Sequence, residues 1–410
     1  MNIDIFREAF IRFKGKLQII DVLFIFSLFS IFLNIPIYPI FFTSVIIVGI
    51  YSLYKDGFRK SLKEVKLNQW LLASFLLWAV VITLIRFTAY PSILIKLILN
   101  LVFLLIFSLV IQKRNNGSLR RIVVKSIRYI IILNFIQLLW IYIPNNLFYE
   151  VLFNGGFENS ITRYVISEYS HIIGISNKNI WAVKLALFQI LYLYDLSYHE
   201  KVGKSNYILV FISIFNMLFL LSRTAQVVYI LALVYFVFER VNRVITKKIK
   251  IVFYTIGGVI LLGIGYIFVD KILNIKLDVT DGGYVRLIYW QTFFENITNT
   301  HFLTGNGLLS ARAFLEAYSP YYIGESNMHN VFLNTWLDFG LIGLILYTGF
   351  LGGTLYWTNQ FRININFIFI IVVPLLFSFM LQYLGYDNDI VLYILCAYLI
   401  SQINNKAEVS

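Results

Sequence analysis

The sequence is poor in charge, in cysteine and in histidine. Only 13% of its 410 residues are Asp, Glu, Lys or Arg, about half the share found in soluble domains. Together with a hydrophobic fraction of 59%, this deficit excludes a soluble enzyme and a disordered protein. The lone Cys396 cannot form an internal disulfide, which excludes a secreted disulfide scaffold. The four histidines are scattered without cysteine partners, so the sequence carries no zinc pattern.

Long apolar runs fill most of the chain. Its apolar residues suffice for about twelve helices that cross the hydrocarbon core of a bilayer, at about 20 residues each. We therefore predict an all-α polytopic membrane protein with about 12 transmembrane helices. The predicted spans are 17–35, 37–54, 69–87, 92–112, 122–143, 179–198, 206–221, 224–239, 249–269, 330–356, 365–383 and 388–403.

The net charge of +13 does not indicate nucleic-acid binding, because the basic residues lie between apolar runs and form no continuous stripe. With the N-terminus placed inside, 22 of the 34 lysines and arginines fall in inside segments, eight in outside segments and four within spans. Cytoplasmic loops of membrane proteins retain Lys and Arg in this way. We therefore predict that both termini face the cytoplasm.

Two predicted outside segments are long, at about 144–178 and 270–329. Segments of this length are uncommon unless they are functional. The second is rich in aromatic residues, so we expect it to fold as a small helical cap lying on the membrane. The chain then divides into N-terminal membrane helices (1–170), central membrane helices (171–269), a large external loop (270–329) and C-terminal membrane helices (330–410).

Two arginines at predicted outside positions are candidates for binding an anion. Arg223 follows Ser222 in a very short turn between two spans, and Arg286 lies in the large loop. A guanidinium group can bind a phosphate through two hydrogen bonds, and a lipid diphosphate is the natural anion at this depth. The alternative for Arg223 is a side chain that only extends to the headgroup level.

His329 is the candidate general base. Ser326-Asn327 precedes an apolar run and is typical of a helix N-cap, which would place His329 in the first helical turn. The helix dipole would lower the pKa of the imidazole there, and a general base must be neutral. The alternative is a structural histidine whose ring hydrogen-bonds a loop carbonyl.

Four basic residues fall within predicted spans or at their boundaries, and they are Lys96, Lys125, Arg128 and Lys184. A charged side chain inside a membrane is costly unless it reaches the interface or finds a partner. We expect most of the four to reach the interface, whereas Lys184 could face a polar cavity.

Several short motifs follow one another between about residues 170 and 360. They are Gly174–Asn179, Ser222-Arg223, Arg286–Trp290, Gly305–Gly307, His329-Asn330 and Asp338–Gly343. In its order, spacing and common external face, this set resembles the O-antigen polymerase and O-antigen ligase superfamily of bacterial surface polysaccharide assembly. The first 170 residues match that superfamily only in hydropathy.

The resemblance implies a multispan, metal-independent glycosyltransferase that needs no cofactor and whose donor is a glycan on undecaprenyl diphosphate. It implies that Arg223 and Arg286 bind the diphosphate and stabilise its developing charge. It implies that His329 activates the acceptor hydroxyl. We also expect the aromatic side chains of the large loop to offer stacking faces for sugar rings. Further candidate substrate contacts are Asn330, Trp290, Arg163 and Glu325.

Within this superfamily we favour a polymerase of O-antigen or capsular polysaccharide, which transfers a growing chain to the next lipid-linked repeat unit. The composition, rich in Ile, Phe, Tyr, Lys and Asn, and the divergent N-terminal half fit such a protein. One alternative is an O-antigen ligase, which transfers the finished chain to lipid A core sugar. Another is a lipid-linked oligosaccharide flippase, although the sequence has no evident internal repeat.

The resemblance also implies a cellular location and a set of binding partners. The expected location is the bacterial inner membrane, with the active site on the periplasmic face. The expected partners are an undecaprenyl-diphosphate-linked oligosaccharide, membrane lipid and, as a candidate, a chain-length regulator protein.

Overall fold

The computed structural model describes most of the chain between residues 18 and 401. Every regular element in this part of the chain is a helix, which is the all-α architecture that the composition predicts. The described residues are 18–33, 35–55, 57, 64–86, 91–113, 116–153, 178–199, 202–244, 282–358, 365–381 and 385–401.

Every predicted span in the described part of the chain corresponds to one or more of the described helices. Seven of them are long and apolar enough to cross a membrane, and four shorter apolar helices accompany them. The span predicted at 249–269 lies outside the described residues. The polytopic all-α fold is therefore confirmed. The elements are α2 (Ile19–Phe32), α3 (Tyr38–Lys55), α5 (Leu67–Arg86), α6 (Pro91–Gln112), α7 (Gly117–Tyr142), α8 (Leu147–Phe153), α10 (Lys178–Ser197), α11 (Lys204–Phe219), α12 (Arg223–Val244), α14 (Gly282–Asn296), η1 (Ile297–Asn299), α15 (Ala311–Tyr318), α16 (Val331–Thr358), α17 (Ile365–Phe367), η2 (Ile368–Val372), α18 (Val373–Leu381) and α19 (Asn388–Ser401).

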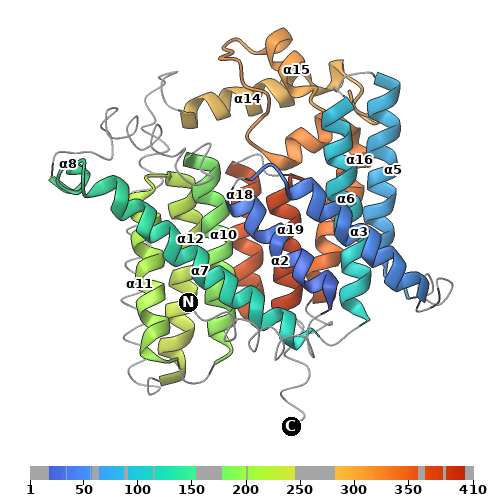
Figure 1. Cartoon of the computed structure of the whole chain (residues 1–410). Coiled ribbons are helices and arrows are strands. Elements are labelled where there is room, and N and C mark those ends of the chain that lie inside the picture. Colours follow the sequence, from blue (N-terminus) through green and yellow to red (C-terminus); the bar gives the residue numbers. More distant parts are fainter. Residues whose placement is uncertain are drawn as a thin grey trace.

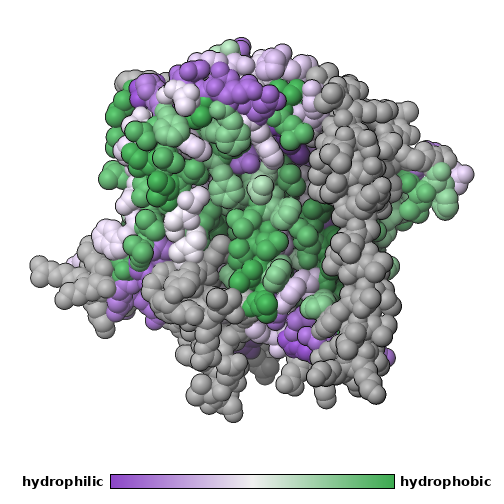
Figure 2. All heavy atoms as spheres, turned by 180° about the vertical axis from the view of Figure 1, so that it is seen from behind, coloured by the Kyte–Doolittle hydropathy of each residue, from purple (hydrophilic) through white to green (hydrophobic). Residues whose placement is uncertain are grey.

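Burial differs strongly between the centre and the edge of the bundle. The apolar window of α10 is 89% buried, whereas that of α3 is only 22% buried. The exposed side chains on the edge helices are largely apolar, as at Ile40 and Leu77. Figure 2 shows polar residues gathered at the two ends of the molecule and apolar residues between them. An apolar belt of this kind is suited to lipid as the solvent.

Two interactions establish the relative directions of three neighbouring helices. Arg120 at the start of α7 pairs with Asp195 at the end of α10 at 2.6 Å. At the other end of α7, the Tyr142 hydroxyl donates to the carbonyl oxygen of Phe219, the last residue of α11, at 2.6 Å. Helix α7 therefore runs antiparallel to α10 and parallel to α11, as the predicted alternation of spans requires.

The helix predicted at 330–356 is broken inside the apolar run. Gly340 has φ 71° and ψ −178°, so α16 consists of two helical pieces that meet at this residue. A left-handed φ is accessible to glycine without steric cost. The break frees backbone groups in the middle of α16, and residues of the large loop satisfy several of them.

A small helical cap covers one end of the bundle (Figure 1). It contains α14, η1 and α15 and the segments that connect them to α16. Helix α14 lies across the end of the bundle rather than along the spans. The cap has a hydrophobic core of its own, so the expected small helical cap is present. The buried residues of this core are Val285, Tyr289, Phe293, Ile297, Ala311, Phe314, Leu315, Met328, Leu333 and Leu337.

The aromatic residues of the cap mostly pack against its core, and the expectation that they offer stacking faces to sugar rings stays a prediction. Phe293 is fully buried and Phe314 is 5% exposed. The Trp336 ring of α16 lies 5.5 Å from that of Phe293 and 5.3 Å from that of Phe302. Burying aromatic surface is what stabilises so small a unit. Phe294 and Tyr318 are the large aromatic side chains of the cap that stay exposed.

Candidate active site

His329 lies just before α16 and not within its first turn. Helix α16 begins at Val331, and the Asn330 side-chain oxygen accepts hydrogen bonds from the backbone N–H groups of Phe332 at 3.0 Å and Leu333 at 3.1 Å. These are the contacts of an N-cap residue. The prediction that Ser326-Asn327 caps the helix was therefore wrong, because Asn330 does so.

The chain turns sharply at His329. Its φ of 51° is left-handed, and its backbone N–H donates to the Asn327 side-chain oxygen at 2.9 Å. Asparagine favours a local turn of this kind because its side chain can bind the backbone two residues later. The turn holds the imidazole at the junction of the cap and α16.

Residues on both sides of His329 are anchored. The preceding Met328 is fully buried, and its N–H donates to the Asn334 side-chain oxygen at 2.7 Å. The Trp290 indole N–H donates to the Met328 carbonyl oxygen at 2.9 Å. Trp290 was predicted as a substrate contact, but the only polar atom of its side chain, Nε1, already holds Met328, the residue before His329, against α14.

The imidazole of His329 faces a carboxylate. Its Nε2 atom lies 3.7 Å from Glu325 Oε2, and the two side chains are 19% and 38% exposed. The Nδ1 atom is buried and has no hydrogen-bond partner within the described part of the chain. The structure thus does not show the ring-to-carbonyl bond of a structural histidine. Glu325 is thus a neighbour of His329, and its contact with substrate stays a prediction.

The pKa of His329 is lowered from its ordinary value. Burial is the largest cause because it disfavours the charged imidazolium, and the positive charge of Arg286 acts in the same direction. The carboxylate of Glu325 opposes both. The predicted lowering is present, although it does not depend on a first-turn position.

Helix α14 brings Arg286 and Trp290 to the histidine segment. The two residues are four positions apart, so they lie on one face of the helix. Their neighbour Tyr289 is fully buried and fixes α14 in the cap core. The Arg-x-x-x-Trp motif therefore supplies two groups. Arg286 is a half-buried cation, and Trp290 donates the hydrogen bond that holds Met328 in place.

Arg223 is the first residue of α12 and is exposed, whereas the preceding Ser222 is 2% exposed. Leu221 has a left-handed φ of 51°, which makes the turn between α11 and α12 tight. The charges that shift the pKa of His329 are those of Arg286 and Glu325, and Arg223 is not among them. The convergence of Arg223 on the same site stays a prediction. Arg163 lies outside the described residues.

Two motifs that the sequence places 33 residues apart meet in space. The Gly307 N–H donates to the Asp338 carbonyl oxygen at 2.8 Å, and the Leu341 N–H donates to the Phe302 carbonyl oxygen at 3.0 Å. The Gly305–Gly307 turn of the cap thus crosses the break in α16 at Gly340 and satisfies its freed backbone groups. Trp78 of α5 donates its indole N–H to the Phe339 carbonyl oxygen at 2.8 Å.

Asp338 is a buried site residue whose contacts sequence reasoning missed. Its Oδ1 atom accepts hydrogen bonds from the backbone N–H and the hydroxyl of Ser310 at 3.0 and 2.8 Å. Its Oδ2 atom accepts the Tyr386 hydroxyl at 3.3 Å. The side chain therefore joins the cap, α16 and the segment before α19. Its position inside a run predicted to span the membrane could have indicated that this aspartate has buried hydrogen-bond partners.

Two lysines that were expected in spans form ion pairs, which the sequence analysis did not predict. Lys96 Nζ lies 2.8 Å from Asp387 Oδ1, and Lys184 Nζ lies 3.8 Å from Asp389 Oδ2. The sequence feature that could have indicated these partners is the occurrence of two aspartates, Asp387 and Asp389, directly before the last apolar run. Among the described residues, no three His, Cys, Asp or Glu side chains gather closely enough to hold a metal.

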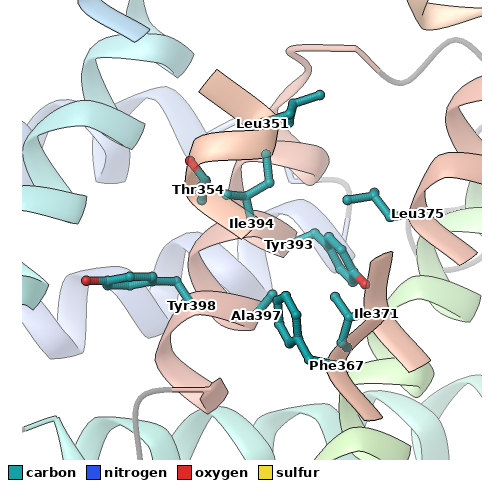
Figure 3. A pocket seen from close by; sticks show the side chains of 9 residues that line it. All are labelled: Leu351, Thr354, Phe367, Ile371, Leu375, Tyr393, Ile394, Ala397 and Tyr398. Carbon is teal, nitrogen blue, oxygen red and sulfur yellow. The ribbon is translucent and has the colours of Figure 1, made fainter. Parts of the chain in front are cut away.

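A small cavity lies away from these residues, between α16, α18 with η2, and α19 (Figure 3). Its lining is mostly apolar, and Thr354, Tyr393 and Tyr398 supply the only hydroxyl groups. It contains no candidate site residue.

Comparison with known families bears on this geometry. Residues 208–348 match the family model of O-antigen ligase. The match confirms the predicted resemblance to the O-antigen ligase and polymerase superfamily. It includes both arginines, the Gly305–Gly307 turn, His329 and the break at Gly340, and it ends inside α16. No curated protein matches the chain.

Proposed function

We propose that this chain is a polysaccharide polymerase of the bacterial inner membrane. It transfers an undecaprenyl-diphosphate-linked glycan to the non-reducing end of the next lipid-linked repeat unit. The observation that carries the proposal is the meeting of His329, Arg286 and Glu325 where the cap joins α16, inside the segment that matches the O-antigen ligase family. In this proposal the cap faces the periplasm and both termini face the cytoplasm.

His329 acts as the general base. Its lowered pKa keeps the imidazole neutral, and Nε2 accepts the proton of the acceptor hydroxyl as the oxygen attacks the anomeric carbon of the donor. The carboxylate of Glu325, 3.7 Å from Nε2, stabilises the imidazolium that forms. The gap exceeds a hydrogen bond, so a hydroxyl can approach Nε2.

Arg286 binds the diphosphate. As the bond between the anomeric carbon and the phosphate oxygen breaks, the leaving diphosphate gains negative charge, which a fixed guanidinium stabilises. Arg223, exposed at the start of α12, is the second cation for the same group. The donor is already activated, so the reaction needs no metal, nucleotide or other cofactor.

An O-antigen ligase is the second candidate, and the family model favours it by its description. The donor and the catalytic groups would be the same, and only the acceptor would differ. A flippase is less well supported, since Arg286 and His329 converge on one end of the bundle rather than along a midplane cavity.

A gel profile of lipopolysaccharide separates these candidates in a host that makes O-antigen. Deleting the gene should remove the ladder and leave core with a single repeat, and wild-type rescue should restore it. Bare core with polymer stranded on the lipid carrier would identify a ligase. Full rescue by His329→Ala would remove His329 as the base and favour a transporter.

A further inference from the structure

Four charged side chains meet where α6, α10 and α19 begin. Lys96 belongs to α6 and Lys184 to α10, while Asp387 and Asp389 flank the start of α19. The charge of Asp389 interacts with all three others. We call these four residues the charge cluster. It contains two cations and two carboxylates, so its formal charge is zero.

The two ion pairs of the charge cluster differ in the distance between their charged groups and in exposure to solvent. The outer pair, Lys96–Asp387, is hydrogen-bonded at 2.8 Å, and its side chains are 42% and 40% exposed. The inner pair, Lys184–Asp389, is separated by 3.8 Å, and its side chains are 13% and 8% exposed. The outer pair opens to the surface, and the inner pair lies behind it.

The inner pair is too far apart for a direct hydrogen bond. An ammonium group has three donors, and within the described part of the chain Lys184 has only the Asp389 carboxylate at 3.8 Å and the Trp181 ring at 6.0 Å. Burying a charge with unused donors costs free energy. A group that both accepts and donates a hydrogen bond, placed beside this pair, would satisfy a donor of Lys184 and an acceptor of Asp389 together.

A hydroxyl group has this property. It can accept from an ammonium and donate to a carboxylate, whereas the two aspartates offset the attraction of the two lysines for a phosphate or carboxylate ligand. Neighbouring hydroxyls of a sugar ring would also satisfy two ion pairs at once. The chemistry of the charge cluster therefore selects a neutral, hydroxyl-bearing ring over an anion.

A hydrogen-bond network connects the charge cluster to the cap. Tyr386, which precedes Asp387, donates its hydroxyl to Asp338, and Asp338 accepts from Ser310 of the cap. Asn100 of α6 donates to the Tyr386 carbonyl oxygen at 3.1 Å, which fixes the start of α19. The charge cluster thus lies beneath the cap that carries His329.

We infer that Lys96, Lys184, Asp387 and Asp389 form a subsite for a hydroxyl-bearing sugar ring of the lipid-linked glycan. The inference rests on the proposed function for the identity of the glycan. It assigns Lys184 and Asp389 to sugar binding, separate from the diphosphate contacts of the arginines.

Binding to the purified full-length chain in nanodiscs tests the subsite without turnover. The probe is the free repeat-unit oligosaccharide, and calorimetry measures its Kd. Lys184→Met should raise the Kd about tenfold or more, as expected for the loss of a hydrogen bond to a charged group. Lys125→Met, an exposed lysine of α7, is the matched control and should leave the Kd unchanged.

A fold control separates binding from misfolding. Lys184→Met leaves Asp389 without its nearest cation. The double variant Lys184→Met/Asp389→Leu removes both charges, so it should restore normal thermal unfolding but not binding. Wild-type binding by the double variant would overturn the subsite.

Two kinetic measurements show whether the subsite binds a sugar of the acceptor or of the donor. An alkyl glycoside of the repeat unit lacks a diphosphate and can serve only as acceptor. A raised KM for this glycoside in Lys184→Met assigns the subsite to the acceptor, and a raised KM for the lipid-diphosphate donor assigns it to the donor. Unchanged KM values for both, with turnover intact, would overturn the subsite and leave the proposed function standing.

Discussion

The backbone of Gly305 in the cap lies directly against the backbone of Gly340 in α16. A Cβ atom on Gly340 would lie 2.6 Å from the Gly305 nitrogen, and one on Gly305 would lie 2.5 Å from the Gly340 nitrogen. Both residues have left-handed φ, at 90° and 71°. The crossing joins the cap to the broken helix and so holds the segment that carries His329 in register with the bundle.

Gly340→Ala should destabilise the protein. A left-handed φ costs a residue with a Cβ atom about 1–2 kcal/mol, and the added atom also meets the backbone of residues 303 and 305. Thermal unfolding in detergent should show a lower Tm. Gly352→Ala is the control, because nothing lies within 4 Å of its Cβ position, and its Tm should not fall. An unchanged Tm for Gly340→Ala would contradict the crossing.

The pH dependence of transfer should report the neutral form of His329. Since the pKa of His329 is lowered, kcat/KM should rise with pH through a midpoint below the ordinary histidine pKa of about 6.5. The charge of Arg286 lowers this pKa, so Arg286→Gln should move the acid limb of the residual activity to higher pH. The charge of Glu325 raises it, so Glu325→Gln should move the limb to lower pH. Shifts in the same direction would contradict this assignment.

Asn330 should act as a helix cap rather than through its amide N–H groups. Asn330→Ala removes the acceptor for Phe332 and Leu333 and should destabilise α16 by about 1 kcal/mol. Asn330→Asp keeps the acceptor and should retain both the Tm and transfer activity. If Asn330→Asp folds normally but loses transfer, the Asn330 amide group contacts the substrate, and its role is not limited to capping α16.

The two ends of the bundle should face opposite sides of the membrane. Cys396 is buried, so single introduced cysteines can be labelled selectively. An impermeant maleimide added to intact spheroplasts should label Glu316→Cys on the cap and should not label Lys204→Cys at the start of α11. Both positions are exposed in the structure. The reverse pattern would invert the predicted topology.

The helices could be predicted because long apolar runs leave the backbone few alternatives in lipid. The N-cap residue of α16 could not, since Ser326, Asn327 and Asn330 are all competent N-cap residues. The structure shows that Asn330 takes this position. The break at Gly340 was hidden because glycine is also frequent inside transmembrane helices.

Long-range contacts account for the rest of the site. Lys96 and Asp387 are 291 positions apart, and no local pattern links them. The sequence identified the Arg286–Trp290 motif, but it did not reveal that the Trp290 N–H is already bound to Met328.

Transfer by the purified chain tests the central claim most directly. The full-length protein is reconstituted with undecaprenyl-diphosphate-linked repeat units as the sole glycan, and the products are analysed by mass spectrometry. Our account predicts lipid-linked dimers and longer chains with equimolar release of undecaprenyl diphosphate, and a loss of about 100- to 10,000-fold in rate for His329→Ala. Movement of the repeat units across the bilayer without any new glycosidic bond would contradict it.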